Sequence, residues 1–345
     1  IMNRLEANGG ELNAYTTKEK IAFYASVLES HFEKAFDLLT DITFDSTFPE
    51  KQIDKERLVI LEEMAMYKDS PDDDLQDEFD NVIYGDHPLG MNILGIKNTV
   101  NKFQKKDFVE FINNNLDTER IVFSIVGNIS MSKVKRLSDK YLGNIPQITK
   151  SRNRKPFDLY LPQTKQIEKN IAQSLCAMGR PAYANNHEKR IPFFMLVNLL
   201  GGPGMNSRLN LALREKHGYV YAVDANYSSF SDTGLFSIIF GTEPKQLKKS
   251  IEVIKKELKK LMNLPLGNMQ MHTAKEQLKG QLAIAEENNA SLMLAIAKSL
   301  IDRNRIDSLE DIFKQIDSVS PKILLDVANQ MFDDNNFSYL TYTPH

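Results

Sequence analysis

Two glutamates seven residues apart are the strongest candidates for chemistry in this sequence. Glu56 and Glu63 lie in the stretch ERLVILEEMAMY, residues 56–67, which consists mostly of strong helix formers and is followed by Asp69-Ser70-Pro71. Residues seven apart lie within about 20° of each other around an α-helix. The residues that share their side of the helix are apolar: Ile53, Val59, Ile60, Met64, Met66 and Tyr67. The pattern therefore predicts two carboxylates in the middle of an apolar helix face.

Such a pair needs a cation nearby, because an ionised carboxylate on a buried apolar face is strongly unfavourable without one. One hypothesis is a pair of buried salt bridges to lysines or arginines elsewhere in the chain. The other is a metal site, in which one glutamate is a ligand and the other supports it through a hydrogen bond. The spacing alone leaves both hypotheses open.

The composition restricts the class of protein. A chain of 345 residues has room for two domains, and 42% hydrophobic with 26% charged residues is typical of a globular protein. The net charge of −3 gives no reason to expect nucleic acid as a partner, and no apolar run approaches the length of a membrane span. The single Cys176 excludes an internal disulfide framework and a cysteine zinc cluster. It fits a reducing compartment, so we expect a cytoplasmic protein.

The order of predicted elements in the first half of the chain returns in the second half. In the first half we expect a strand pair, an amphipathic helix, the glutamate helix, a further helix and a buried strand, at 11–17 with 20–28, 32–42, 56–67, 103–115 and 120–127. In the second half we expect a strand pair, a lysine-rich amphipathic helix, two more helices and a last strand, at 219–230 with 235–240, 247–261, 270–287, 311–332 and 337–343. The predicted fold is α+β, with two homologous domains that each layer helices on a largely antiparallel sheet. Residues 1–145 form the first domain, the proline-containing segment 146–168 is a linker, and residues 169–345 form the second domain.

Several separated motifs resemble one known family. GGELNAYT at 9–16, Glu56-Arg57, Glu63 and the segment 214–221 resemble, in that order, the pitrilysin family of inverted-motif zinc peptidases, which includes insulysin and mitochondrial processing peptidase. The resemblance runs over essentially the whole chain. It implies a processing-peptidase-like metallohydrolase fold, a Zn²⁺ cofactor and a metalloendopeptidase that cleaves peptides or unfolded protein segments in a closed chamber. It also implies a homodimer, or a complex with a second subunit of the same family. The alternative is a non-catalytic scaffold or partner subunit of that family.

The resemblance assigns a role to each glutamate. In the family, two histidines of an H-x-x-E-H motif and a downstream glutamate hold the zinc. Glu63 matches that glutamate and is the expected metal ligand. Glu56 matches the acidic residue seven positions earlier, which supports the site.

Two further sets of residues match the family's substrate contacts. Asn13, Ala14 and Tyr15 match an edge strand to which a peptide substrate adds as another strand. The alternative is an ordinary hairpin strand after a Gly-Gly turn. Arg214 and Tyr221 match a pair from the second domain that reaches the substrate backbone and the attacked carbonyl, where both are suitable donors. The alternative for this pair is an arginine at a helix end and a tyrosine in the core.

One part of the family's pattern is missing, because the sequence contains no H-x-x-E-H. The six histidines are isolated from one another: His31, His87, His187, His217, His272 and His345. The resemblance would place the motif about a dozen residues before Ile1, so we expect that the chain lacks the N-terminal segment that carries it. A catalytic zinc needs three protein ligands, and Glu63 supplies one. We predict that this polypeptide neither binds zinc tightly nor cleaves peptides by itself.

Overall fold

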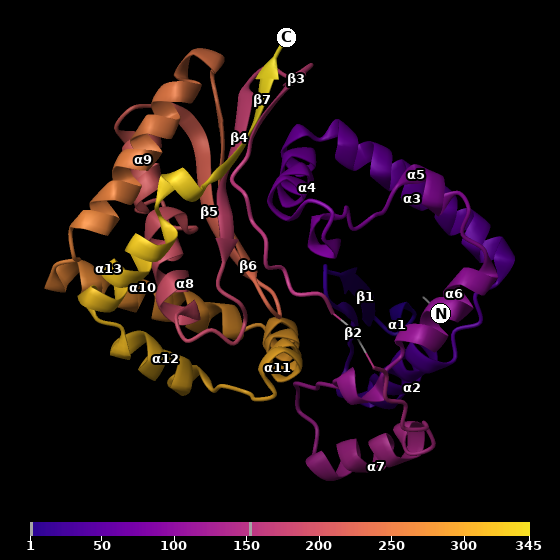
Figure 1. The fold of residues 1–345 in the computed structure, drawn as a ribbon. Helices are drawn as coiled ribbons and strands as arrows, with labels where there is room; N and C mark the ends of the chain where they lie inside the picture. The colour runs from indigo at the N-terminus through magenta and orange to yellow at the C-terminus, as the bar shows by residue number, and fades with distance from the viewer. Residues whose placement is uncertain (1–2, 152–153) are drawn as a thin grey trace. The chain divides into compact units, whose positions relative to one another are not determined.

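A computed structural model describes residues 3–151 and 154–345 and has an α+β architecture (Figure 1). The described residues form two compact units. Unit 1 contains residues 1–64, 93–154 and 285–304, and unit 2 contains residues 65–92, 155–284 and 305–345. Both units draw on separate parts of the chain, whereas the sequence predicts domains at 1–145 and 169–345. That division stays a prediction.

Unit 1 is mainly helical and contains one β-hairpin. Strands β1 (Glu11–Thr16) and β2 (Ile21–Ser26) pair antiparallel, as the sequence predicts. The helices of this unit are α1 (Asn3–Glu6), α2 (Phe32–Phe44), α5 (Lys97–Val100), α6 (Lys105–Asn115), α7 (Met131–Leu142), α11 (Asn289–Arg303) and most of α3 (Glu50–Asp69). Its small core contains the buried residues Leu5, Ala35 and Leu38, against which hairpin residues pack. The helix predicted at 103–115 is confirmed as α6.

The strand predicted at 120–127 is wrong. A 3-10 turn at Thr118–Arg120 is followed by residues 121–126 without regular secondary structure. Ile121 and Phe123 are 38% and 39% exposed. An apolar run favours a strand only where a neighbouring strand takes up its backbone hydrogen bonds, and this segment pairs with no strand in the described part of the chain.

Unit 2 is built on a five-stranded sheet in the order β3-β7-β4-β6-β5 (Figure 1). The strands are β3 (Thr164–Lys169), β4 (Ser174–Ala182), β5 (Val220–Ser229), β6 (Gly234–Thr242) and β7 (Ser338–Pro344). The pair β3 and β7 is parallel, and the other neighbours are antiparallel. The largely antiparallel sheet predicted for this half, including its strand pair and its last strand, is therefore confirmed.

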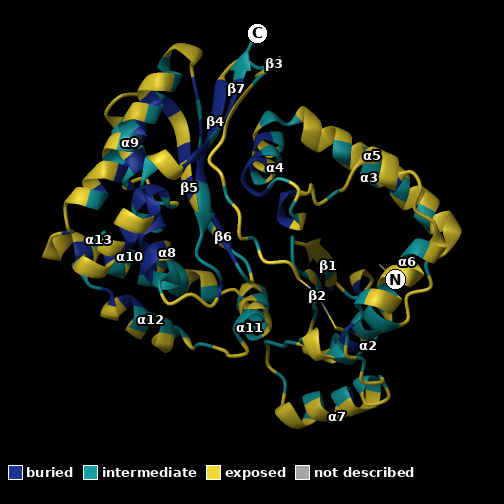
Figure 2. Ribbon diagram, viewed as in Figure 1, coloured by how far each residue is buried: buried dark blue, intermediate teal, exposed yellow. Residues whose placement is uncertain are grey.

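Helices cover both faces of this sheet. The larger core lies against α8 (Arg190–Gly201), α9 (Leu247–Asn263), α10 (Asn268–Glu286) and α13 (Pro321–Met331), and it is filled by Phe193, Phe236 and Phe332 among others. On the other face, α4 (Pro71–Tyr84) packs on β4 and β7 through Leu75, Phe79 and Ile83. Figure 2 shows the buried residues concentrated along these strands and the inner sides of these helices.

Polar contacts fix α4 on the sheet. Lys169 of β3 forms an ion pair with Asp74, and the hydroxyl of Tyr342 on β7 donates a hydrogen bond to the same carboxylate. At the other end of α4, the Tyr84 hydroxyl donates to the carbonyl oxygen of Gly234 at 2.9 Å. Because these partners are tertiary, the docking of α4 could not be read from its own sequence.

The helix predicted at 311–332 is two helices in the structure. Helix α12 (Leu309–Ser318) ends before Ser320, whose hydroxyl accepts a hydrogen bond from the Ile323 backbone N–H at 3.2 Å and so caps α13. Pro321 is at the start of α13, where its missing N–H costs nothing. No helix in the described residues is both long enough and apolar enough to cross a membrane.

Candidate functional site

The two glutamates lie on α3 in unit 1, and both are exposed. No described residue of α3 is buried (Figure 2). Leu58 and Met66 are 66% and 61% exposed. The prediction of a buried apolar face around the carboxylates is therefore wrong. Helical periodicity states which residues share a side of the helix, but what covers that side is decided by other segments.

The salt-bridge hypothesis for these glutamates also finds no support in the structure. Arg57, the basic residue beside Glu56, pairs instead with Asp54 at 2.6 Å. The same guanidinium donates to the carbonyl oxygens of Val100 and Phe103 at 3.3 and 2.6 Å. Neither Glu56 nor Glu63 forms an ion pair with any residue that the structure describes. Two solvated carboxylates about 10 Å apart along the helix axis remain.

The donors in the described residues do not fit a complete zinc site. No group of three or more histidine, cysteine, aspartate or glutamate side chains in residues 3–151 and 154–345 is arranged to hold a metal ion. A catalytic zinc requires three such ligands, and Glu63 can provide one of them. No step of a reaction is therefore assigned to zinc on these residues.

Strand β1 has one paired edge and one edge that no described strand occupies. Asn13, Ala14 and Tyr15 pair with Tyr24, Phe23 and Ala22 of β2, and all three β1 residues are exposed. An unpaired edge presents backbone N–H and C=O groups to which an extended peptide can add. The geometry fits both strand addition and an ordinary hairpin strand.

Arg214 and Tyr221 lie together in unit 2. The guanidinium carbon of Arg214 is 5.5 Å from the centre of the Tyr221 ring, within the range of a cation–π contact. Tyr221 is 83% exposed, so the alternative interpretation as a core tyrosine is wrong. Arg214 is half-buried, and its Nε lies 3.7 Å from the carboxylate of Glu215. A permanent cation and a phenol thus share one exposed surface.

Three departures from regular backbone structure bring this pair together. Arg214 lies in a π-helical segment, Asn210–Glu215, a rare conformation that is frequently found at functional sites. Gly218 then adopts a left-handed conformation with φ of +60°, and its N–H donates to the Arg214 carbonyl oxygen at 2.9 Å. A register shift in β5 between Val220 and Val223 follows, and Tyr221 lies within it.

The register shift explains the exposure of Tyr221. Val220 pairs with Thr242 and Val223 pairs with Phe240, so β5 has one residue more than β6 over this interval. Val220 and Val223 both point into the core, at 6% and 1% exposure, while the residues between them are exposed. In a regular strand two such core-facing residues would be two apart. The sequence gives only an indirect sign of this bulge, namely the odd spacing of the two valines.

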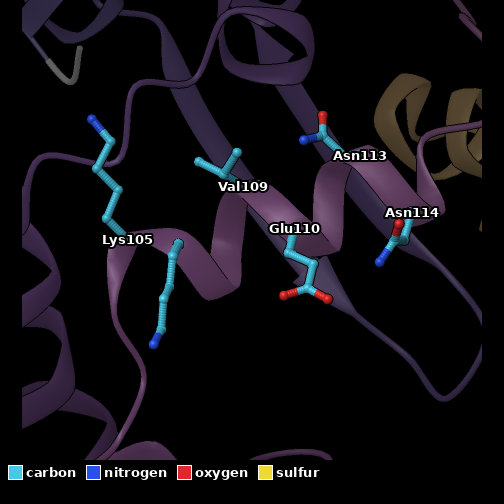
Figure 3. A pocket seen from close by; sticks show the side chains of 6 residues that line it. Lys105, Val109, Glu110, Asn113 and Asn114 are labelled. Atoms are coloured by element: carbon cyan, nitrogen blue, oxygen red, sulfur yellow. The ribbon is translucent and has the colours of Figure 1, made fainter.

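A shallow surface depression of about 570 Å³ follows one side of α6 (Figure 3). Its lining consists of Lys105, Lys106, Val109, Glu110, Asn113 and Asn114. None of the predicted site residues is among them. Because all of these side chains come from one open side of a single helix, the depression offers no enclosed binding site.

Known proteins are similar to this chain over nearly all of its length. The family description "Insulinase (Peptidase family M16)" matches residues 1–97, and "Peptidase M16 inactive domain" matches residues 102–278. The "uncharacterized zinc protease YmxG" of Bacillus subtilis is 32% identical over 335 residues, which are 97% of this chain and 81% of that protein. An "uncharacterized zinc protease" of Rickettsia felis is 32% identical over 332 residues, 96% of this chain and 80% of that protein.

Solved structures show the same fold. A protease from Helicobacter pylori has a TM-score of 0.87 and 22% identity, covering 98% of this chain and 83% of its own. A peptidase M16 inactive domain from Pseudomonas fluorescens has a TM-score of 0.90 and 18% identity, covering 99% and 82%. The family resemblance of the sequence motifs is thus confirmed: this chain belongs to the insulinase family of peptidases, family M16.

Proposed function

We propose that this protein is a zinc-dependent metalloendopeptidase that acts on peptides or unfolded protein segments, and that residues 1–345 by themselves do not catalyse the reaction. Arg214 and Tyr221 contact the substrate backbone and the attacked carbonyl. Glu63 is one zinc ligand, and Glu56 supports it. The observation that supports this proposal most is the contact between Arg214 and the exposed ring of Tyr221.

The chemistry of the pair suits a peptide carbonyl under attack. Attack on the carbonyl places negative charge on its oxygen, and donors aimed at that oxygen lower the barrier by about 3 kcal/mol each. A guanidinium is always charged and carries five N–H donors, and a phenol adds one O–H donor. Since Tyr221 extends into solvent, its hydroxyl is accessible to a substrate.

The edge of β1 that no described strand occupies supports a broad peptide specificity. A peptide that adds to Asn13–Tyr15 is held mainly by main-chain hydrogen bonds, and every residue except proline has the backbone N–H that these bonds require. We therefore propose unfolded segments of varied sequence as the substrate class.

Assembly belongs to the same proposal. A closed chamber formed by two copies, or with a second subunit of the family, would enclose the peptide. The glutamate pair and the Arg214–Tyr221 pair occur on one chain, which favours a homodimer over two chains with divided roles. The cytoplasmic location stays a prediction.

The second candidate function is a non-catalytic scaffold or partner subunit. The observation that favours it is the lack of three clustered metal ligands in the described residues. Under this alternative the chain binds a second subunit stably but has no affinity for unfolded peptide. Peptide binding therefore separates the two candidates without any need for turnover.

The experiment is a titration of a fluorescein-labelled unfolded peptide with residues 1–345, followed by fluorescence anisotropy. We expect saturable binding that Arg214→Gln weakens. Lys216→Gln is the matched control, because it removes an equal charge from an exposed residue two positions away. Absence of saturable binding would overturn the peptidase proposal in favour of the scaffold. An equal loss with Lys216→Gln would show general charge attraction and contradict the role of Arg214.

A further inference from the structure

The segment that carries Arg214 and Tyr221 is anchored by a residue outside it. Thr242, the last residue of β6, is 2% exposed, and its hydroxyl donates a hydrogen bond of 2.6 Å to the backbone carbonyl oxygen of Tyr219. Tyr219 lies between the left-handed Gly218 and the first residue of β5. The bond therefore holds the backbone at the point where it leaves the turn and enters the bulge.

We propose that Thr242 is a positioning residue for the Arg214–Tyr221 pair, acting through the Tyr219 carbonyl. The inference rests on the proposed function only in that it explains how that pair is kept in place. Thr242 does not touch a substrate, since its side chain is buried under the turn. Its effect is on where the backbone directs Tyr221.

The exposure of Tyr221 is the reason that the backbone has to supply this order. At 83% exposure the ring has almost no packing partners, and its contact with Arg214 is a single cation–π interaction at 5.5 Å. An exposed contact of that kind is weak and does not by itself fix a side chain. The direction of the ring is therefore set by the backbone of the bulge.

The backbone between Leu213 and Val220 is held by core packing at both ends and by the Thr242 hydrogen bond at Tyr219. Leu213 and Val220, on either side of the turn, are 0% and 6% exposed, and the Tyr219 N–H donates to the Leu213 carbonyl oxygen at 2.9 Å. Gly218 between them meets no atom within 4 Å of where a Cβ would stand, so packing does not restrain it. Val220 and the Tyr219 ring pack against the core, and the Thr242 hydroxyl adds a side-chain hydrogen bond to the backbone where the left-handed glycine meets the strand bulge.

The absence of tryptophan from the sequence permits a direct test. Tyr221→Trp introduces a single reporter at the exposed position, where a larger ring has room and where tryptophan is the best cation–π partner. The fast component of its fluorescence anisotropy decay measures how freely the ring moves on the nanosecond scale. The measurement needs neither substrate nor zinc, so its outcome is independent of whether the pair binds peptides.

Three further substitutions are each combined with Tyr221→Trp. Thr242→Val keeps the shape and removes the hydroxyl, and we expect a larger fast component. Thr242→Ser keeps the hydroxyl, and we expect the reporter to behave as in the parent. Thr341→Val is the matched control, because Thr341 is a similarly buried threonine on β7 of the same sheet.

The outcomes are decisive in both directions. A larger fast component in Thr242→Val alone supports the proposal. An unchanged decay in Thr242→Val, or an equal increase in Thr341→Val, overturns it. Should Thr242→Val fail to fold by circular dichroism, Thr242→Ala replaces it with the same expectation, because it also removes the hydroxyl and adds no bulk.

Discussion

The guanidinium of Arg214 lies 5.5 Å from the ring centre of Tyr221, although six residues that include a helix end and a turn separate them in the chain. The contact joins the end of the π-helical segment to the bulge of β5. It places two hydrogen-bond donors of different strength on one exposed surface.

Tyr221→Phe keeps the ring and removes the hydroxyl. In an assembly that carries the complete zinc ligand set, we expect kcat to fall about 100-fold with KM almost unchanged, because the hydroxyl acts on charge that develops only in the transition state. Steady-state kinetics measure both constants. Tyr219→Phe, a neighbouring ring that stacks on His217, is the control and is expected to leave both unchanged. A Tyr221→Phe variant with normal kcat would remove the assignment.

Ala14→Pro tests the edge of β1. Proline removes a backbone N–H and is incompatible with a continuous strand ladder, so we expect labelled unfolded peptide to lose its saturable binding. Ala14→Val retains the N–H and favours a strand, and it is expected to bind like the parent. The anisotropy titration described above measures both variants. Unchanged peptide binding by a folded Ala14→Pro variant would exclude strand addition at this edge.

Residues 1–345 are expected to hold much less than one zinc ion per chain after loading and dialysis. The reason is that Glu63 offers one ligand where a tight site needs three. Elemental analysis of the dialysed protein measures the stoichiometry, and Glu63→Gln provides the comparison. A full equivalent of zinc that disappears in Glu63→Gln would contradict this prediction.

Cys176 is expected to be unreactive until the protein unfolds. Burial raises the pKa of its thiol to about 12, so about one thiol in ten thousand is ionised at pH 8 in the folded state. Alkylation followed by mass spectrometry should therefore be very slow in buffer and fast in denaturant. Fast alkylation of the folded chain would show that β4 opens readily.

Because of the raised pKa of Cys176, we expect the free energy of unfolding to depend on pH. The pKa of the Cys176 thiol is higher in the folded than in the unfolded protein, so the unfolded state loses this proton first as the pH rises. The free energy of unfolding is therefore unaffected by this group below about pH 8.5 and decreases as the pH rises toward 12. Urea unfolding at pH 8 and pH 10.5 measures the loss. Cys176→Ala, which cannot ionise, is expected to lose less stability over the same interval. An identical loss in both proteins would assign the pH dependence to other groups.

Local sequence patterns predicted several elements of unit 2, although strands β3 and β4 and helix α8 were not among them. The strand pair at 219–230 and 235–240, the amphipathic helix at 247–261 and the last strand at 337–343 all form close to where they were predicted. They form there because each has apolar residues on one side, and these sides pack together in one core. The separated motifs, above all GGELNAYT and the glutamate pair, were enough to identify the family.

Burial of helix faces and pairing of strands depend on the tertiary structure, which sequence periodicity does not contain. It left Glu56 and Glu63 in solvent, because the burial of a helix face depends on a segment that packs opposite it. It left residues 121–126 without a strand, because a strand exists only through a partner. The contact of Arg214 with Tyr221 likewise depends on a π-helical segment, a left-handed glycine and a bulge in β5. The bulge forms through pairing with β6, and Thr242 of β6 bonds to the Tyr219 carbonyl oxygen, so its position is set by residues distant in sequence.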